Sequence, residues 1–246
     1  QITARNIGGL TYEVTLTLYR DTLGIPMYTT ANVEYFDSLS MPIMTRIVLV
    51  GAPTAIGNGV EKYAYVDTVT FPYAGEFHAQ FSDCCRNAAI MNIGSGAGSG
   101  SLYLDNIIYA DPSNSSPVFL NDPITVAQDS VPFSYNPSPF DIDGDSLSWV
   151  MDIPMDFVSG SSSGLPFPVY FLPPSDTANP FTLNPITGEI TFTPIAIGNF
   201  QISVKAIEYR NGVAIGSIRR DMQLIVIPSP NTPIVVSATP NIYRVM

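Results

Sequence analysis

The stretch Gly9-Leu10-Thr11-Tyr12-Glu13-Val14-Thr15-Leu16-Thr17-Leu18-Tyr19-Arg20 alternates between apolar and polar side chains at nearly every step. A period of two is typical of a β-strand that buries one face. Nowhere in the sequence does an apolar period of 3.6 persist for ten residues, so no long helix is expected. Short strands separated by Gly, Pro and Asn are typical of an antiparallel sandwich. In the first half, such runs are further predicted at 29–36, 43–50, 62–71, 76–82, 88–93 and 102–109.

The polar segment 110–117, which is bracketed by prolines, is a natural domain boundary. Beyond it a type I′ hairpin is predicted at Asn211-Gly212. We therefore expect an all-β chain of two tandem immunoglobulin-like antiparallel β-sandwiches, over 1–112 and 113–228, with a proline-rich linker and extended C-terminal strand or tail over 229–246. Strands of the second half are predicted at 117–120, 123–127, 131–135, 146–151, 167–172, 180–183, 188–193, 199–210 and 213–227.

The composition of the chain makes some classes of binding partner unfavourable. The net charge is −11 and only ten basic residues are present, scattered singly, so nucleic acid and anionic membranes are poor partners. No apolar run approaches the length of a membrane span, and membrane insertion is not expected. No basic-then-apolar segment opens the chain, so any signal peptide is expected to have been removed. Low lysine content with abundant Thr, Ser, Tyr and Asn favours a secreted, cell-surface location.

The segment Asp141-Ile142-Asp143-Gly144-Asp145 places three carboxylates at alternate positions around a glycine. Hard oxygen ligands at this spacing suit Ca²⁺ better than a transition metal, which would favour His or Cys. The loop is not an EF-hand, because its glycine is fourth rather than sixth and Pro154 would interrupt the helix that should follow. The pattern predicts a calcium-binding turn that leads into a strand; the alternative is a solvated acidic turn without an ion.

Residues suited to catalysis are scarce. The single histidine, His78, lies in an alternating strand, and a lone strand histidine is more often structural than catalytic. The glycine-rich run 94–100 matches neither a nucleophile elbow nor a phosphate-binding loop. The single tryptophan, Trp149, lies on an inward-facing strand position and is expected in the core rather than on a sugar-binding platform. We expect a protein that is not an enzyme, with a secreted hydrolase as the least favoured alternative.

Two adjacent cysteines, Cys84 and Cys85, complete the inventory of reactive groups. Across a trans peptide their Cα atoms would lie about 3.8 Å apart, below the usual disulfide range, and in a strand their side chains would point to opposite faces. We expect one buried thiol and one that is free or otherwise engaged, with a redox site as the lesser alternative.

Several motifs, taken together and in order, resemble a family of secreted surface proteins of Bacteroidota, whose members are described as gliding-motility-associated or as PKD- and cadherin-like. The resemblance covers most of residues 2–227. It implies tandem immunoglobulin-like sandwiches on a cell surface, the second of them cadherin- or PKD-like and calcium-binding, and it implies no catalytic activity. Many relatives carry more cysteines, including one where this chain has Thr22. The motifs are LTYEVTLTLYRD (10–21), GVEKYAY (59–65), DCCRN (83–87), SSPVF (115–119), DIDGDSL (141–147) and EYRNGVAIG (208–216).

The resemblance also implies site residues. Asp141, Asp143 and Asp145 match the acidic loop of the family, and Glu208 and Asn114 match weaker acidic and Asn-x-x-Pro positions. A recurrent triplet, Asp followed by Ser or Thr and then a small or aliphatic residue, resembles the general O-glycosylation signal of Bacteroidota. Asp-Ser/Thr pairs also simply favour turns. Glycans are predicted on Thr22, Ser38, Thr68, Ser130 and Thr177.

The last prediction concerns the C-terminal tail, residues 229–246. An apolar strand that follows a stiff proline-rich linker either packs back on its own domain or pairs with the edge of a neighbouring molecule. The sequence therefore predicts an extracellular structural subunit of a surface fibre or layer, assembled with itself by β-strand addition and stiffened by Ca²⁺. The alternative is an adhesin or carbohydrate-binding module that recognises surface glycans. The strand-donating residues would be Ile234, Val235, Val236, Tyr243 and Val245.

Overall fold

The computed structural model describes residues 1–49, 51–57, 59–94, 98, 100–123, 125–157 and 164–230. These residues form β-strands and turns, with no α-helix among them, and the pairing between strands is antiparallel except where β10 joins β19. The predicted all-β fold is therefore confirmed. The described part of the chain also contains no helix long and apolar enough to cross a membrane. The predicted strand-donating residues, 234–236, 243 and 245, lie outside the described residues.

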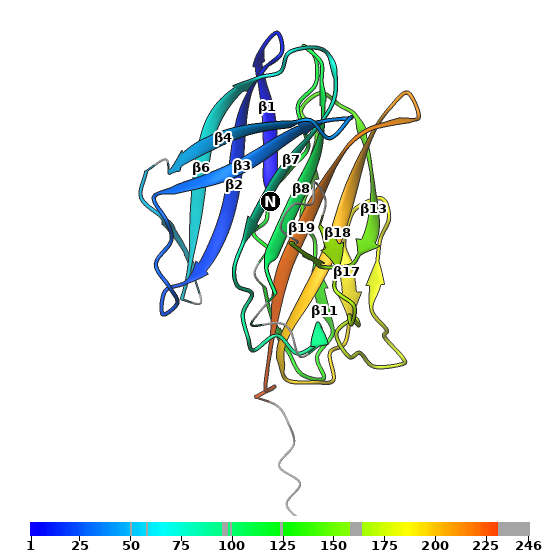
Figure 1. Ribbon diagram of the computed structural model, residues 1–246. Coiled ribbons are helices and arrows are strands. Elements are labelled where there is room, and N and C mark those ends of the chain that lie inside the picture. The colour runs from blue at the N-terminus through cyan, green and yellow to red at the C-terminus, as the bar shows by residue number, and fades with distance from the viewer. Residues whose placement is uncertain are drawn as a thin grey trace, which may run out of the picture.

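The first half folds as an antiparallel sheet that bends around its own core in the order β1-β2-β6-β4-β3-β7-β8 (Figure 1). The alternation that predicted β2 is borne out, because Tyr12, Val14, Leu16 and Leu18 all lie in this core. The strands are β1 (Ile2–Gly8), β2 (Thr11–Asp21), β3 (Thr30–Asp37), β4 (Pro42–Leu49), β5 (Thr54–Gly57), β6 (Val60–Thr70), β7 (Gly75–Asp83) and β8 (Leu102–Ala110).

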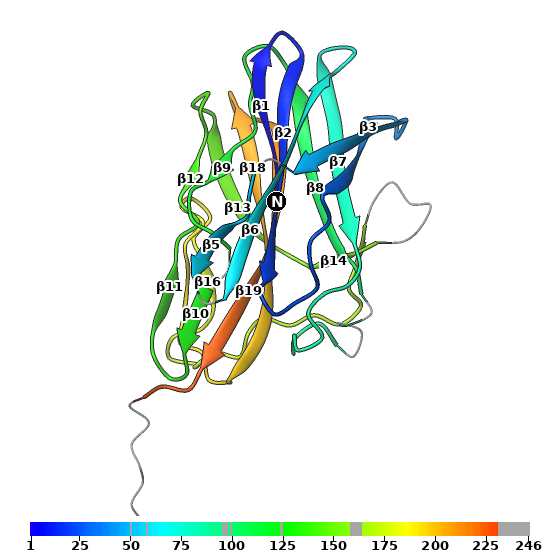
Figure 2. The same cartoon turned by 90° about the vertical axis from the view of Figure 1, so that its left-hand side faces the viewer.

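The second half is built on the long β18–β19 hairpin, which turns at Asn211-Gly212 as predicted. A second core, centred on Trp149, Phe192 and Phe200, lies beneath it. In Figure 2, β10, β11 and β16 lie toward the end of the molecule where β19 finishes. The strands are β9 (Val118–Phe119), β10 (Thr125–Gln128), β11 (Phe133–Tyr135), β12 (Pro139–Phe140), β13 (Ser146–Asp152), β14 (Met155–Asp156), β15 (Leu165–Pro166), β16 (Thr182–Leu183), β17 (Ile190–Phe192), β18 (Gly198–Arg210) and β19 (Val213–Ile227).

One sheet crosses from the first half to the second. Strand β8 pairs with β19 at Asn106 with Ile218 and at Ile107 with Ser217, so the sheet order continues as β7-β8-β19-β18-β13. The connecting segment is also fixed to β1, because Ala4 donates its backbone N–H to the Ser116 hydroxyl at 2.7 Å. The buried apolar side chains still form two main clusters, one in each half. The division into domains at 112/113 stays a prediction.

Buried ion pairs reinforce this junction. Arg86, from the loop after β7, pairs with Asp221 of β19 at 2.6 Å, and both side chains are 3% exposed. Arg219 of β19 reaches Asp105 of β8 and Asp152 of β13, each at 2.5 Å. Such pairs cost desolvation when they form, but loss of one partner leaves a buried charge without compensation. Separation of the two halves would therefore leave the charges of Arg86 and Arg219 without their partners in the other half, which is energetically costly.

Two predicted strands, 88–93 and 167–172, are not strands. Their apolar residues Ile90, Ile93 and Phe167 instead pack into a small separate cluster. The Asn92 side chain replaces a strand partner: its Nδ2 donates to the carbonyls of Phe171 and Gln201, and its Oδ1 accepts the N–H of Gln201. A buried amide that satisfies backbone groups on two segments is invisible to a search for periodicity.

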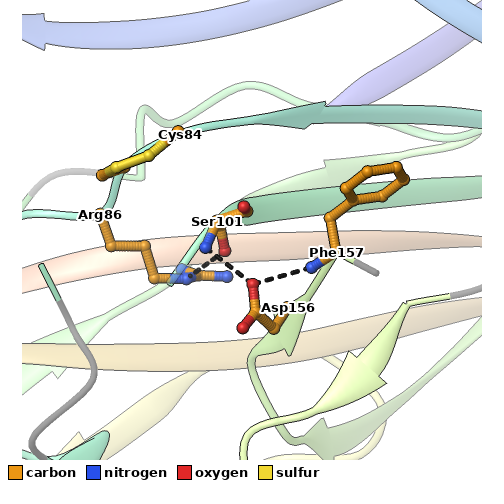
Figure 3. The surroundings of a disulfide bond; sticks show 6 residues. Cys84, Arg86, Ser101, Asp156 and Phe157 are labelled. Atoms are coloured by element: carbon orange, nitrogen blue, oxygen red, sulfur yellow. Dashed lines mark hydrogen bonds between the residues drawn. A yellow bond between two sulfur atoms is a disulfide. The ribbon is translucent and has the colours of Figure 1, made fainter. Parts of the chain in front are cut away.

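The expectation for the cysteines is wrong. Cys84 and Cys85 are joined to each other by a disulfide, both are exposed, and the peptide between them is cis (Figure 3). The expectation assumed a trans peptide within a strand. However, β7 ends at Asp83, and the two Cα atoms lie 3.1 Å apart. The next residue, Arg86, turns inward and its Nε donates to the carbonyl of Ser101.

Substitution Asp221→Asn should lower the free energy of unfolding by about 3–5 kcal/mol, because it leaves the Arg86 guanidinium buried without a countercharge. Urea unfolding at neutral pH measures the change. The matched control is Glu13→Gln, whose partner Arg5 is 60% exposed and which should cost no more than about 1 kcal/mol. Equal effects of the two substitutions would contradict a junction held by buried charge.

Candidate metal centre

The acidic turn connects β12 to β13 and is closed by its own first residue. Asp141 Oδ1 accepts the backbone N–H groups of Asp143 and Asp145, both at 3.0 Å. Gly144 has φ +84°, a left-handed conformation that glycine adopts without a Cβ penalty. The alternation of acidic residues around a glycine therefore has a structural cause. The Asp141 side chain folds the turn, and the glycine allows it to close.

Glu208 reaches this turn from the neighbouring strand. In the β13–β18 ladder Leu147 pairs with Glu208 and Ser146 with Tyr209, so the turn stands beside this end of β18. One carboxylate oxygen from each of Asp141, Asp145 and Glu208 lies within 4.8 Å of the others. Three carboxylates that are far apart in sequence thus converge on a point that a single cation could contact.

The cluster contains carboxylate oxygens without partners. Glu208 is 1% exposed, and its Oε1 has no hydrogen-bond partner within the described structure. Its Oε2 lies so close to Gly216 that a Cβ there would stand 2.7 Å away. Asp141 Oδ2 is likewise buried and without a hydrogen-bond partner in this part of the chain. Unsatisfied buried carboxylate oxygens are costly unless a proton or a cation compensates them.

Burial and the nearby carboxylate of Asp141 raise the pKa of Glu208 to about 8, with a further contribution from Asp145. Burial also raises the pKa of Asp141. These shifts have the same physical origin as the orphan oxygens, because negative charge has been gathered where water has little access. The cluster can relieve this charge either by holding a proton on Glu208 or by binding a cation.

The all-oxygen ligand set suits a hard cation such as Ca²⁺ rather than a transition metal. The two oxygens without partners fit this role, since both are acceptors that a cation would satisfy. Three carboxylates are fewer than the six to eight oxygens that Ca²⁺ prefers, so backbone oxygens or waters would complete its coordination.

The other two predicted ligands bond elsewhere. Asp143 accepts the backbone N–H of Ser115. Asn114 accepts from Arg210 through Oδ1 and donates to the Tyr109 carbonyl through Nδ2. Asp143 and Asn114 thus surround the cluster without joining its three convergent oxygens, and their role as ligands stays a prediction.

Sequence reasoning missed Arg210. Its guanidinium holds Asp145 with two bonds, Nε to Oδ1 at 2.9 Å and Nη2 to Oδ2 at 2.5 Å. It also reaches Asn114 at 2.7 Å. The available signal was its spacing from Glu208, because residues two apart on a strand share a face.

The other residues singled out from the sequence are His78, Trp149 and the predicted glycosylation residues, and they differ in their burial and contacts. His78 Nε2 lies 3.1 Å from Glu76 Oε1 on β7. Trp149 is 2% exposed and packs against Phe119, so it belongs to the core as expected and offers no platform for a sugar. The predicted glycosylation residues share exposure to solvent: Thr22, Ser38, Thr68, Ser130 and Thr177.

Comparisons with known proteins identify no family. No family model matches the chain, and no curated protein matches it. Among solved structures, the tandem Ig repeats of Dlar match over 87% of this chain and 90% of theirs, at 10% identity and a TM-score of 0.26. The I67–I69 I-band fragment of titin matches over 89% of this chain and 59% of its own, at 10% identity and a TM-score of 0.24. CfaE, the adhesive subunit of CFA/I fimbria of enterotoxigenic Escherichia coli, matches over 92% and 81%, at 10% identity and 0.15. Likenesses this distant decide nothing about function, and the resemblance to Bacteroidota surface proteins stays a prediction.

In calcium-free buffer, the free energy of unfolding should fall as the pH rises from about 5 to about 8. The pKa of Glu208 is raised from its ordinary value of 4.5, so its stabilising protonation is complete below 4.5 and lost near 8. The groups facing it are Asp141, Asp145 and Arg210. Urea unfolding across this pH range measures the effect, and Glu208→Gln should flatten it. An identical pH profile in the variant would contradict the assignment.

If the exposed triplets carry glycans, peptides released from protein of the native source that contain these triplets should be heavier than their unmodified sequences by the mass of a glycan. Intact-mass spectrometry of a Thr68→Ala variant should then show the loss of one glycan. The matched control is Thr70→Ala, because Thr70 is exposed on the same strand but does not follow an aspartate. Unmodified masses for all triplet-containing peptides of the native protein would remove the hypothesis.

Proposed function

We propose that this protein is a non-enzymatic extracellular structural protein, a subunit of a surface fibre or layer. The observation that carries the proposal is the junction between its halves. A sheet that runs through β8 and β19, with buried ion pairs on Arg86 and Arg219, makes a stiff unit rather than two modules on a flexible linker. A subunit that transmits force or holds a spacing needs this property.

Further contacts lie along the same junction. Lys62 and Tyr19 of the first half both bond to Asp122 Oδ1, each at 2.8 Å. Ser101 donates its backbone N–H to Asp156. Met91 donates its backbone N–H to the Asn199 carbonyl at 2.9 Å. The halves therefore meet through backbone pairing, side-chain bonds and ion pairs on several separate strands and loops, which resists both bending and twisting.

A bound cation would stiffen the second half beside the junction. The acidic cluster joins the 141–145 turn to β18, and Arg210 ties Asp145 to Asn114 of the connecting segment. A Ca²⁺ ion that binds only the folded form must raise its stability by mass action. In a calcium-containing extracellular medium, such an ion would hold the 141–145 turn against β18 within the second half, next to the segment that connects the two halves.

Assembly is assigned to the C-terminal tail. An apolar strand that follows a stiff linker can complete the sheet of a neighbouring copy, because an unpaired strand edge is a ready template for another strand. The partner in this proposal is a second copy of the chain, and the net charge of −11 keeps unassembled subunits soluble.

Removal of the tail tests assembly. The full chain should form oligomers or fibres whose proportion rises with concentration, whereas a chain ending at Pro228 should remain monomeric. Size-exclusion chromatography with light scattering, followed by electron microscopy of the high-mass fraction, measures this. The control is a full-length chain with Val235→Asp and Val236→Asp, which keeps the tail length but places charge on the donated strand. Monomers in all three samples would contradict assembly by strand addition.

A further inference from the structure

A cation is already present at the acidic cluster, and it is the guanidinium of Arg210. The two bonds from its Nε and Nη2 to Asp145 form the bidentate fork that binds carboxylates most strongly. The Asp145 side chain is only 7% exposed, whereas the Arg210 side chain is 28% exposed, so the carboxylate is the member of the pair that is largely withdrawn from water. A metal ion at the cluster therefore meets a carboxylate that already has a partner.

The arginine does not balance the charge of the cluster. Asp141, Asp145 and Glu208 bring three carboxylates together, and the fork of Arg210 covers only Asp145. Glu208 Oε1 and Asp141 Oδ2 remain without hydrogen-bond partners in the described structure. The charge that attracts a cation is thus present, while a positive group stands beside the position where that cation would sit. A metal ion there and the Arg210 guanidinium would carry like charges, and like charges repel more strongly where water is largely excluded.

Arg210 also has a second set of partners. Its Nη2 donates to Asn114 Oδ1 at 2.7 Å, and its Nη1 lies 3.4 Å from the Ser113 hydroxyl. Asp111 Oδ1 lies 4.0 Å from Nη1. If the guanidinium gave up Asp145, it would keep neutral acceptors and a nearby carboxylate. A guanidinium that left Asp145 would therefore still face the Asp111 carboxylate. Exchange of Arg210 with an incoming ion is thus physically feasible.

We propose that Arg210 is an exchangeable internal counter-ion that competes with Ca²⁺ for Asp145 and thereby sets the calcium affinity of the cluster. The inference rests on the proposed cation site and adds its regulation. The chain would hold calcium weakly, in the range of extracellular concentrations, because each binding event must displace or repel the arginine.

Calcium titration of the full-length protein by isothermal calorimetry tests the proposal. Arg210→Gln removes the competing charge and should bind Ca²⁺ at least about tenfold more tightly than the wild type. Arg210→Lys keeps the charge but loses the fork, and should fall between the two. Lys205→Gln is the matched control, because it removes one positive charge from the same strand outside the cluster, and its affinity should stay within about twofold. Glu208→Gln locates the binding, since it should weaken it in every background.

The outcomes separate the inference from the cation site itself. Wild-type binding that depends on Glu208, with an unchanged affinity in Arg210→Gln, would overturn the competition and leave the site in place. Binding by Arg210→Gln but not by the wild type would support the competition and remove calcium from the proposed function. Absence of calcium binding in both would overturn both ideas. Circular dichroism melts confirm that each variant is folded before it is titrated.

Discussion

The architecture depends on the short pairing of β8 with β19. Only Asn106 with Ile218 and Ile107 with Ser217 are in register, yet this contact makes one sheet of two halves that have separate cores. The charged groups around it are arranged to match. Arg219 bridges β8 and β13, and Arg86 reaches β19 from the loop after β7. Backbone hydrogen bonds set the alignment of the two halves, and buried charges make every other alignment costly.

The acidic cluster lies next to the segment that connects the two halves. Its carboxylates come from the turn before β13 and from β18, and Arg210 links them to the segment that leaves the first half. Charge gathered there destabilises the bare fold and is useful only if something neutralises it. A proton, the arginine and a metal ion are three alternative ways to neutralise it, and the balance among them is what the surroundings of the protein can change.

The sequence predicts the local elements well and the junction poorly. Alternation identified β2, and Asn-Gly identified the β18–β19 turn, because both signals are local. The same rule failed at 88–93 and 167–172, where apolar residues pack from loops and Asn92 satisfies the backbone instead of a strand. The turn at 141–145 was predicted from its spacing, and Glu208 from a resemblance. The Arg210 fork and the Cys84–Cys85 disulfide were not, because each depends on local geometry that residue types alone do not specify.

The pairing of β19 with β8 also constrains when the molecule can fold. Ile107 and Ser217 are partners in the sheet although they lie far apart in the sequence. Until β19 is available, the inner edge of β8 has no strand beside it, and Arg86 lacks Asp221. Contacts between distant residues form late and slowly, and partly completed sheets tend to aggregate. A nascent chain therefore benefits from remaining unfolded, or shielded by a chaperone, until residues beyond 227 have emerged.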